Sequence, residues 1–197
     1  MFVQVISGKV KDADLLKRQN ERWIAELKPG TKGYLGATGG ITPDGRSIML
    51  ARFESQEVAE SNSGRAEQDA WWNETEKAFD GEVTFLDCTE VDTPLGGGSN
   101  DAKFVQVIQG RAKDPAALRS MANEREAELR KARPDILGMI VAWHGDGRDF
   151  TQAVYFKDEQ SARAGESETQ NDEMRKEYEG MFDGEPTFYD LTDLILD

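Results

Sequence analysis

The residues best suited to hold a ligand gather in the first half of this 197-residue sequence. Trp71, Trp72 and Asn73 are consecutive within a helix predicted over residues 55–79. Because side chains three and four positions apart are neighbours on a helix, Trp72, Thr75 and Phe79 should share the face that meets a sheet. Indole rings offer flat apolar walls on which a planar ligand can stack.

Polar side chains expected near these aromatic residues are those of Tyr34, Arg52, Asn62 and Asn73. Hydrogen bonds from such groups to ligand oxygens, together with stacking on the rings, would suit a planar phenol or quinol. The second half carries Met-Arg-Lys at 174–176 where the first has Trp-Trp-Asn, which favours a recess in the first half. The alternative is that the tryptophans simply fill the core, as large aromatic residues generally do.

A glutamine recurs inside an apolar strand pattern in both halves of the chain. Gln4 lies within Phe-Val-Gln-Val-Ile at 2–6, and Gln106 lies within the same five residues at 104–108. A glutamine amide on an inner strand requires hydrogen-bond partners. These two side chains could therefore bind a ligand, or they could link two sheets across a shared core.

Other residues that could do chemistry are few. His144, the single histidine, falls at a predicted turn, where histidines are usually exposed. Cys88, the single cysteine, corresponds to Leu191 in the second half, so it should act as a small buried hydrophobe rather than a catalytic thiol. The sequence has no HxH, HExxH or CxxC pattern, and its Gly-Gly-Gly run at 96–98 precedes no helix. It therefore predicts no metal and no cofactor.

An internal repeat organises the elements that must position these residues. Besides the strand at 2–6, Phe-Asp-Gly-Glu-Val-Thr-Phe-Leu-Asp-Cys-Thr at 79–89 returns with few changes at 182–192. The boundaries predicted from the repeat are a first unit at 1–92, a Gly-rich flexible linker at 93–102 and a second unit at 103–197.

Each unit is predicted to contain a strand, a helix, a hairpin, a second helix and a last strand. The first helices should begin after the caps Asp12 and Asp114. The hairpin strands are expected at 34–41 and 47–53 in the first unit and at 136–143 and 149–156 in the second. The second helices, over 55–79 and 158–182, should break near 62–64 and 164–165, and the last strands should cover 82–91 and 185–194.

This element order predicts an α+β fold made of two tandem ferredoxin-like βαββαβ units. The first strand of each unit is apolar on both faces, whereas one layer of helices covers only one face of a sheet. We therefore expect the two sheets to pack face to face, as an intramolecular dimeric α/β barrel.

Composition narrows the classes of partner. Hydrophobic residues make up 38% and charged residues 31% of the chain, as in an ordinary globular protein, and no apolar run is long enough for a membrane span. The net charge of −14 disfavours nucleic acid and anionic membranes as partners. No signal peptide pattern is present and one cysteine allows no internal disulfide, so we expect a cytoplasmic protein.

The element order, the duplicated FVQVI and the FDGExTFxD ending resemble the dimeric α/β-barrel superfamily, in its stress-responsive and antibiotic-biosynthesis-monooxygenase-like branch, as a fused tandem. The resemblance covers nearly the whole chain but includes no catalytic signature. It implies a ligand site between a sheet and its helices. Members of the superfamily include cofactor-independent quinone-forming monooxygenases, haem-degrading enzymes, haem peroxidases and proteins of no known activity.

The functional hypothesis is a small-molecule-binding protein that oxidises an aromatic phenol or quinol without a cofactor. Arg52 would stabilise an anion and Trp72 would form a stacking wall. The sequence identifies no general base for this reaction. One alternative is a non-catalytic scaffold or ligand sensor, in which duplication made a dimer permanent, and another is haem binding through His144 or Tyr34. Further self-association of the internal pseudo-dimer is a possible interaction.

Overall fold

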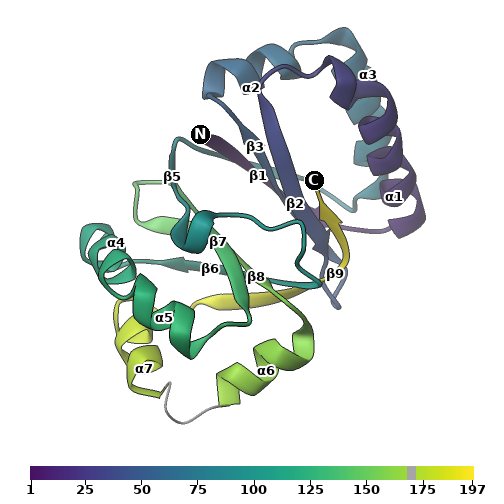
Figure 1. Ribbon diagram of the computed structural model, residues 1–197. Helices are drawn as coiled ribbons and strands as arrows, with labels where there is room; N and C mark the ends of the chain where they lie inside the picture. The colour runs from purple at the N-terminus through teal and green to yellow at the C-terminus, as the bar shows by residue number, and fades with distance from the viewer. Residues whose placement is uncertain (168–171) are drawn as a thin grey trace.

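The computed structural model describes residues 1–167 and 172–197, and these form two units of similar topology, one above the other in Figure 1. In each unit the helices lie on the outer side of a sheet, while the two sheets face each other in the middle of the molecule. The first unit consists of β1 (Phe2–Lys9), α1 (Ala13–Arg22), β2 (Tyr34–Ile41), β3 (Arg46–Phe53), α2 (Gln56–Ser63), α3 (Ala66–Thr75) and β4 (Thr84–Cys88), followed by the short β5 (Glu90–Asp92).

The second unit repeats this order. It consists of β6 (Phe104–Arg111), α4 (Pro115–Glu124), α5 (Glu126–Ala132), β7 (Ile136–His144), β8 (Asp149–Phe156), α6 (Glu159–Ser167), α7 (Asp172–Gly180) and β9 (Thr187–Leu196). The helix predicted over 158–182 includes residues 168–171, which lie outside the described residues.

Both predicted helix caps are confirmed. The Asp12 carboxylate accepts a hydrogen bond of 2.8 Å from the Leu15 amide. The Asp114 carboxylate accepts from the amides of Ala116 and Ala117, at 3.0 and 3.1 Å. These contacts satisfy N–H groups that have no partner inside the helix, which explains why each helix begins where it does.

The predicted breaks in the second helices have different outcomes. The first is confirmed, because α2 ends at Ser63 and α3 begins at Ala66. The second, predicted near 164–165, does not fall at these residues, because α6 continues through them to Ser167 and α7 begins at Asp172, with 168–171 outside the described residues. Gly165 is instead a point of close packing, since a Cβ built there would lie 2.3 Å from Nε of Arg133.

Within the described residues, nine strands form one sheet in the order β4-β1-β3-β2-β9-β6-β8-β7-β5. The last strand of each unit pairs first with its own unit and then with the other. β9 pairs with β6 up to Leu191, and from Thr192 onward it pairs with β2. Likewise β4 pairs with β1, and after a break at Thr89 the chain continues as β5, which pairs with β7. This exchange produces a nearly closed barrel.

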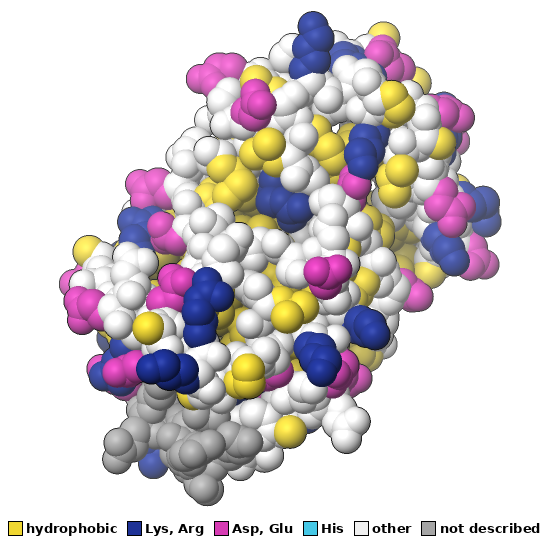
Figure 2. Space-filling model, in the orientation of Figure 1, with side chains coloured by type: hydrophobic (Ala, Val, Ile, Leu, Met, Phe, Trp, Pro, Cys, Tyr) yellow, Lys and Arg dark blue, Asp and Glu magenta, His cyan; other side chains and the backbone are white. Residues whose placement is uncertain are grey.

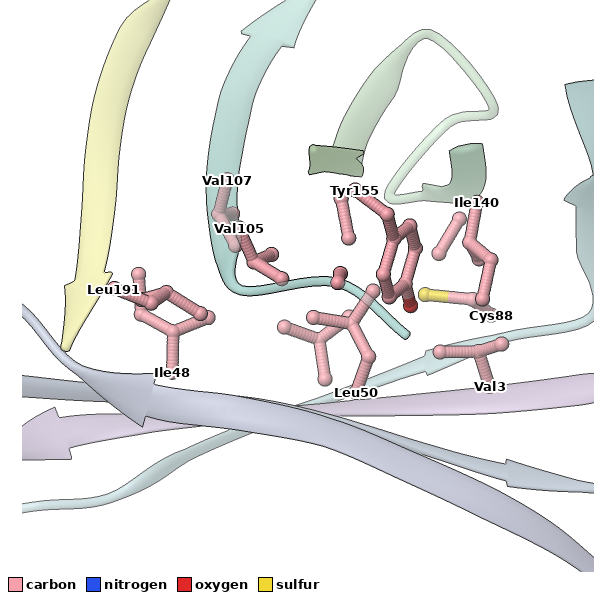
Figure 3. Close-up of a cluster of buried hydrophobic side chains, with 13 residues drawn as sticks. Val3, Ile48, Leu50, Cys88, Val105, Val107, Ile140, Tyr155 and Leu191 are labelled. Carbon is pink, nitrogen blue, oxygen red and sulfur yellow. The ribbon is translucent and has the colours of Figure 1, made fainter. Parts of the chain in front are cut away.

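A single apolar core fills the barrel and joins the two units, which confirms the predicted sheet-to-sheet packing. Figure 3 shows side chains of the first unit, such as Val3 and Leu50, facing side chains of the second, such as Val105 and Ile140. Cys88 belongs to this core and is fully buried, and burial raises the pKa of its thiol to about 12. The prediction that Cys88 acts as a small hydrophobe is therefore confirmed.

The connection between the units is packed against the barrel, although its composition indicated a flexible linker. Leu95 and Ala102, near its two ends, are 4% and 7% exposed. Between them the main chain passes so close to β7 that a Cβ built on Gly138 would lie 1.8 Å from the carbonyl oxygen of Gly97. The linker is therefore packed against the barrel at these positions, despite its Gly-rich composition.

Charged side chains of both signs are interspersed on the face shown in Figure 2, beside scattered hydrophobic groups. Surface ion pairs include Arg22 with Glu26 and Arg130 with Glu126, and each contributes little to stability. No helix in the described part of the chain is long and apolar enough to cross a membrane.

Candidate functional site

The repeated glutamines are held by carboxylates within their own units. Gln4 and Gln106 donate hydrogen bonds of 2.8 and 2.9 Å to Asp87 and Asp190, which lie directly opposite on the neighbouring strands. Because side chains alternate along a strand, both amides point away from the barrel core that contains Val3 and its equivalents. Neither glutamine therefore links the two sheets across the core.

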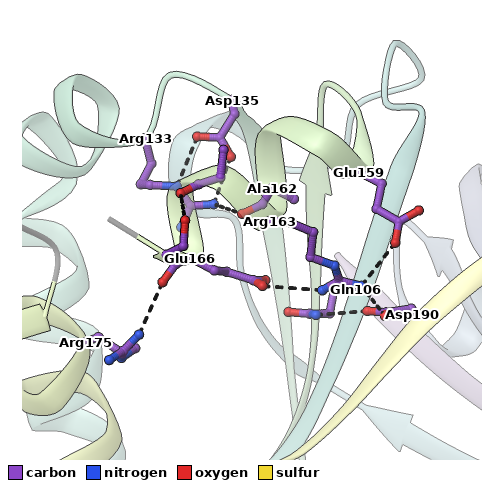
Figure 4. Close-up of polar contacts among 11 residues, drawn as sticks. Gln106, Arg133, Asp135, Glu159, Ala162, Arg163, Glu166, Arg175 and Asp190 are labelled. Carbon is purple, nitrogen blue, oxygen red and sulfur yellow. Dashed lines mark hydrogen bonds and ion pairs between the residues drawn. The ribbon is translucent and has the colours of Figure 1, made fainter. Parts of the chain in front are cut away.

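The second copy adds a cation to this arrangement. Arg163 on α6 forms an ion pair with Asp190 (Figure 4). It also lies over the ring of Phe104, with its guanidinium carbon 5.1 Å from the ring centroid. The position of Arg163 corresponds to Glu60 in the first unit. The Gln106–Asp190 pair is therefore more buried than the Gln4–Asp87 pair. It also has additional contacts through Arg163, which makes both the ion pair and the cation–π contact.

Most of the aromatic residues of the first unit form a continuous series of ring contacts. Trp23 packs edge-on to Tyr34 at 4.9 Å and against Trp71 at 6.5 Å, measured between ring centroids. The indole N–H of Trp71 donates to the main-chain oxygen of Gln19, and that of Trp23 donates to the side chain of Gln68. These contacts tie α1 and the π-helical turn at 23–27 to α3, so packing accounts for Trp23 and Trp71.

Trp72 lies beside a surface hollow of about 470 Å³. Its ring contacts those of Phe79 and Phe85, at centroid distances of 6.3 and 5.1 Å. Phe85 is 44% exposed, so this hollow has an open aromatic wall. Its remaining lining residues are Lys11, Glu76, Lys77, Gly81, Glu82 and Val83.

The two predicted asparagines lie apart from this hollow. Asn62 is buried, and its side-chain oxygen accepts a 2.8 Å hydrogen bond from Arg65, which also donates to Thr31. Asn73 is exposed on α3. Neither asparagine lines the hollow beside Trp72.

Arg52 is buried on the barrel side of β3, with only 8% of the residue exposed. Its Nη1 donates to the hydroxyl of Thr38 at 2.7 Å, and its Nη2 donates to the main-chain oxygen of Asp197 at 2.8 Å. The Thr38 hydroxyl also lies 2.5 Å from that of Tyr155, the residue that corresponds to Arg52 in the second unit. The duplicated position thus carries an arginine in one copy and a tyrosine in the other, and Thr38 joins them.

Burial raises the pKa of Tyr155, against the opposing effect of Thr38 and Arg52, so this phenol stays protonated. Sequence reasoning missed Thr38, Tyr155 and Asp197 as neighbours of Arg52. The difference between Arg52 and Tyr155 was visible in the repeat, but the pairing of β9 with β2 that brings them together was not.

Tyr34 and Arg52 meet at the same residue, Asp197. The Tyr34 hydroxyl donates to Asp197 Oδ2 at 3.2 Å, and Lys28 forms an ion pair with the same carboxylate. Burial and the negative charge of Asp197 raise the pKa of Tyr34. Gly36 makes this approach possible, because a Cβ built there would lie 2.1 Å from the main-chain oxygen of Asp197.

A groove of about 590 Å³ lies between the linker and the barrel, and Arg52 contributes to its lining. Ile140, Leu35 and Met1 are its hydrophobic lining residues, and Asp197 also borders it. The linker supplies Thr93, Gly96, Gly97, Gly98, Ser99, Asn100 and Asp101. Trp72 and Arg52, expected to share one recess, line two different hollows.

The Arg52 side chain has hydrogen-bonding capacity to spare. A guanidinium carries five N–H donors; the hydrogen bonds to Thr38 and Asp197 use two of them, and the Tyr155 hydroxyl also interacts with the guanidinium. Within the described residues, no Asp or Glu side chain forms an ion pair with Arg52. The groove is therefore suited to a ligand that brings its own oxygen acceptors.

His144 lies at the end of β7, half-buried, with Nε2 3.2 Å from the hydroxyl of Thr151. Burial lowers its pKa, against an opposing effect of Asp149. The residues that the structure describes contain no cluster of three or more His, Cys, Asp and Glu side chains that could hold a metal ion.

Comparison with solved structures identifies the fold. A protein of Lactobacillus acidophilus named "putative monooxygenase" superposes with a TM-score of 0.74 at 14% identity, covering 100% of this chain and 98% of its own. A Fusobacterium nucleatum protein with the same description gives a TM-score of 0.74 at 11% identity, covering 100% of this chain and 93% of its own. An anthrone oxidase-like protein gives 0.66 at 13% identity, covering 99% and 92%.

These likenesses confirm the predicted fold class, a fused dimeric α/β barrel of two ferredoxin-like units, which this chain shares with these proteins. No family model matches the sequence. No curated protein matches it either. At 11–14% identity the structural likeness extends to the fold and not to a substrate.

Proposed function

We propose that the protein binds a small planar organic molecule in the groove beside Arg52, as a ligand-binding member of the monooxygenase-like barrel group. The observation that carries this proposal is the buried guanidinium of Arg52, which retains N–H donors beyond those that Thr38 and Asp197 accept, at a groove whose walls include the apolar side chains of Met1, Leu35 and Ile140. Ligand sites typically combine such walls with a few well-placed polar groups. The cytoplasm remains the expected location.

A second candidate is cofactor-independent oxidation of a phenol or quinol. It is favoured by the likeness to an anthrone oxidase-like protein. Arg52 would stabilise the phenolate or enolate that reacts with oxygen. Forming that anion requires a base, and the carboxylates lining the groove are Asp101, which is exposed, and Asp197, which Tyr34 and Lys28 engage. The geometry therefore supports binding better than oxidation.

The scaffold alternative is favoured by the packed tryptophans of the first unit. The ring contacts of Trp23 and Trp71 and their indole hydrogen bonds give both residues a packing role. Haem binding is the weakest alternative, because Tyr34 already donates to Asp197 and His144 already contacts Thr151. A Soret band on adding haemin that disappears in Tyr34→Phe or His144→Ala would revive it.

A thermal-shift screen tests the proposal. Wild type would be tested against anthrones, naphthoquinols, flavonoids, haemin and aromatic acids, together with Arg52→Gln and Trp72→Phe. Arg18→Gln, an exposed arginine on α1, is the matched control. A ligand at about a hundred times its Kd stabilises by about 2.7 kcal/mol, which is measurable as a rise in Tm.

If a compound stabilises wild type and Arg18→Gln but not Arg52→Gln, the result would support a binding site in the groove beside Arg52. If the stabilisation is lost only in Trp72→Phe, the ligand binds in the hollow beside Trp72 and not in the groove. If no compound shifts the Tm of the wild type, the scaffold alternative is preferred. Oxygen uptake with a stabilising phenol, absent from Arg52→Gln, would establish the oxidation.

A further inference from the structure

We infer that the ligand of the Arg52 groove carries a carboxylate, and that Arg52 binds this carboxylate with its unused donors. The inference rests on the proposed function and names the chemical class of the ligand. A guanidinium presents its N–H groups as a planar fork that matches the two oxygens of a carboxylate. Neutral ligands such as esters and ketones offer only one comparable acceptor.

A second arginine in the same chain shows what a similarly buried guanidinium takes as a partner. Arg133 has 13% of its side chain exposed, and it forms two hydrogen bonds with Asp135, at 3.0 and 2.8 Å. Arg52 is buried to a comparable degree, yet no Asp or Glu side chain among the described residues pairs with it. A buried charge is costly unless it is paired, so a ligand carboxylate would supply the partner that Asp135 supplies to Arg133.

The neighbours of Arg52 hold its guanidinium ready for such a ligand. Thr38 accepts from Nη1, and the Thr38 hydroxyl is itself fixed by Tyr155 at 2.5 Å. The main-chain oxygen of Asp197 accepts from Nη2. With both ends of the fork anchored, little side-chain entropy remains to be lost when a ligand binds.

The remaining lining favours a monoanion with a flat apolar body. Arg52 is the only arginine or lysine that lines the groove within the described residues, while Asp101 and Asp197 border it. A doubly charged phosphate would be repelled by these carboxylates and would find one guanidinium to neutralise it. Ile140 and Leu35 offer apolar contact to the body of the ligand, and Gly98 brings the linker main chain close, since a Cβ there would lie 3.3 Å from Ile140.

Matched probes test the inference by titration calorimetry on the full chain. The probes are naphthoate, its methyl ester, naphthol and naphthyl phosphate, which share one aromatic body and differ in the acidic group. Naphthoate should bind roughly tenfold or more tightly than the ester, the expected effect of a charge-assisted hydrogen bond. Arg52→Gln should remove this preference, and Arg52→Lys should retain only part of it, because an ammonium cannot make the planar bidentate contact. Arg18→Gln should behave as wild type.

Equal binding of naphthoate and its ester, or tighter binding of naphthol or of the phosphate, would overturn the carboxylate inference and leave small-molecule binding in the groove intact. Naphthoate binding that persists unchanged in Arg52→Gln would also overturn it. If the wild type binds none of the four probes, the carboxylate inference fails, whereas the proposed function fails only if the wider screen is negative as well. If Arg52→Gln does not fold, the affinities of wild type and Arg52→Lys for naphthoate and for its methyl ester still test the carboxylate inference.

Discussion

The same glutamine–aspartate pair occurs twice in this chain, in two different surroundings. Gln4 is half-buried and Asp87 is exposed, whereas Gln106 is 7% exposed and its partner Asp190 also pairs with Arg163. The residue types alone could not distinguish a ligand-binding amide from a structural one. In the structure, both amides form a hydrogen bond within their own sheet. The two copies therefore allow the contribution of this hydrogen bond to the free energy of unfolding to be compared at two degrees of burial.

We expect Gln106→Ala to lower the free energy of unfolding by about 2 kcal/mol and Gln4→Ala to lower it by less than about 1 kcal/mol. A hydrogen bond to a charged group is worth more when water cannot replace it. Urea unfolding of both variants measures the difference, and each serves as the control for the other. Equal losses would mean that the burial of Gln106 contributes nothing.

His144 makes stability depend on pH in a defined direction. Burial disfavours the imidazolium, so the pKa of folded His144 lies below its ordinary value of 6.5. When the pH falls through 6.5, the unfolded chain takes up the proton first, and the folded state loses stability until the lowered pKa is passed. Above 6.5 both states are neutral at this residue and the effect vanishes.

The stability advantage of wild type over His144→Gln should therefore be larger at about pH 7.5 than at about pH 5.5. Thermal unfolding of both proteins at the two pH values measures this difference in stability. Because all other titrating groups are the same in wild type and in the variant, their contributions cancel. Asp149 opposes the shift, so Asp149→Asn should increase the pH dependence. An advantage that is larger at low pH would show that Asp149, rather than burial, controls the pKa of His144.

At the scale of elements, one glycine position receives a neighbouring chain segment in both units. Gly36 and Gly138 follow the irregularity at the start of β2 and β7. The main-chain oxygen of Asp197 packs on Gly36, and that of Gly97 packs on Gly138. In each unit, the chain segment that follows the last strand therefore packs on the glycine at the equivalent position of the other unit.

Gly36→Ala and Gly138→Ala should each destabilise the protein, by roughly 2 kcal/mol or more, because the new methyl group would collide with backbone oxygen. Gly138→Ala should also displace the linker from β7, while Gly36→Ala should release the end of β9. Gly81→Ala is the control for backbone strain, since Gly81 has φ +82° but nothing within 4 Å of a built Cβ. Urea unfolding with limited proteolysis of the linker measures both effects. A loss in Gly138→Ala no greater than in Gly81→Ala would contradict the packing described here.

The elements show where sequence reasoning succeeds. The duplicated strands, the caps Asp12 and Asp114 and the hairpins follow from local rules, and the structure confirms them. The exchange of β5 and β9 between units could not be predicted, because strand pairing at the ends depends on tertiary contacts. Arg52 lies on the barrel face of β3 with Ile48 and Leu50, whereas Trp72 packs with Phe79 on the helix-covered face. The predicted site residues therefore line two hollows that the sequence had suggested were one.

At the scale of the whole molecule, the barrel core belongs equally to both units. Val5 of the first unit is 1% exposed and its counterpart Val107 of the second is fully buried, and both lie in the same core. Neither sheet could bury its inner face alone, so each unit depends on the other for stability. The linker at 93–102 keeps the two units together at every protein concentration, unlike a dimer of separate chains.

We therefore expect one cooperative unfolding transition for the whole chain. Trp143 is the single tryptophan of the second unit, so the fluorescence of Trp143→Phe reports on the first unit alone, while far-UV circular dichroism reports on both. In this background Val5→Ala and Val107→Ala should each lower the stability by about 2 kcal/mol and shift both signals together, because the cavity opens in a shared core. A first-unit fluorescence transition that moves with Val5→Ala but not with Val107→Ala would show that the two units unfold independently. Coincident shifts would establish that the duplicated halves behave as a single folding unit.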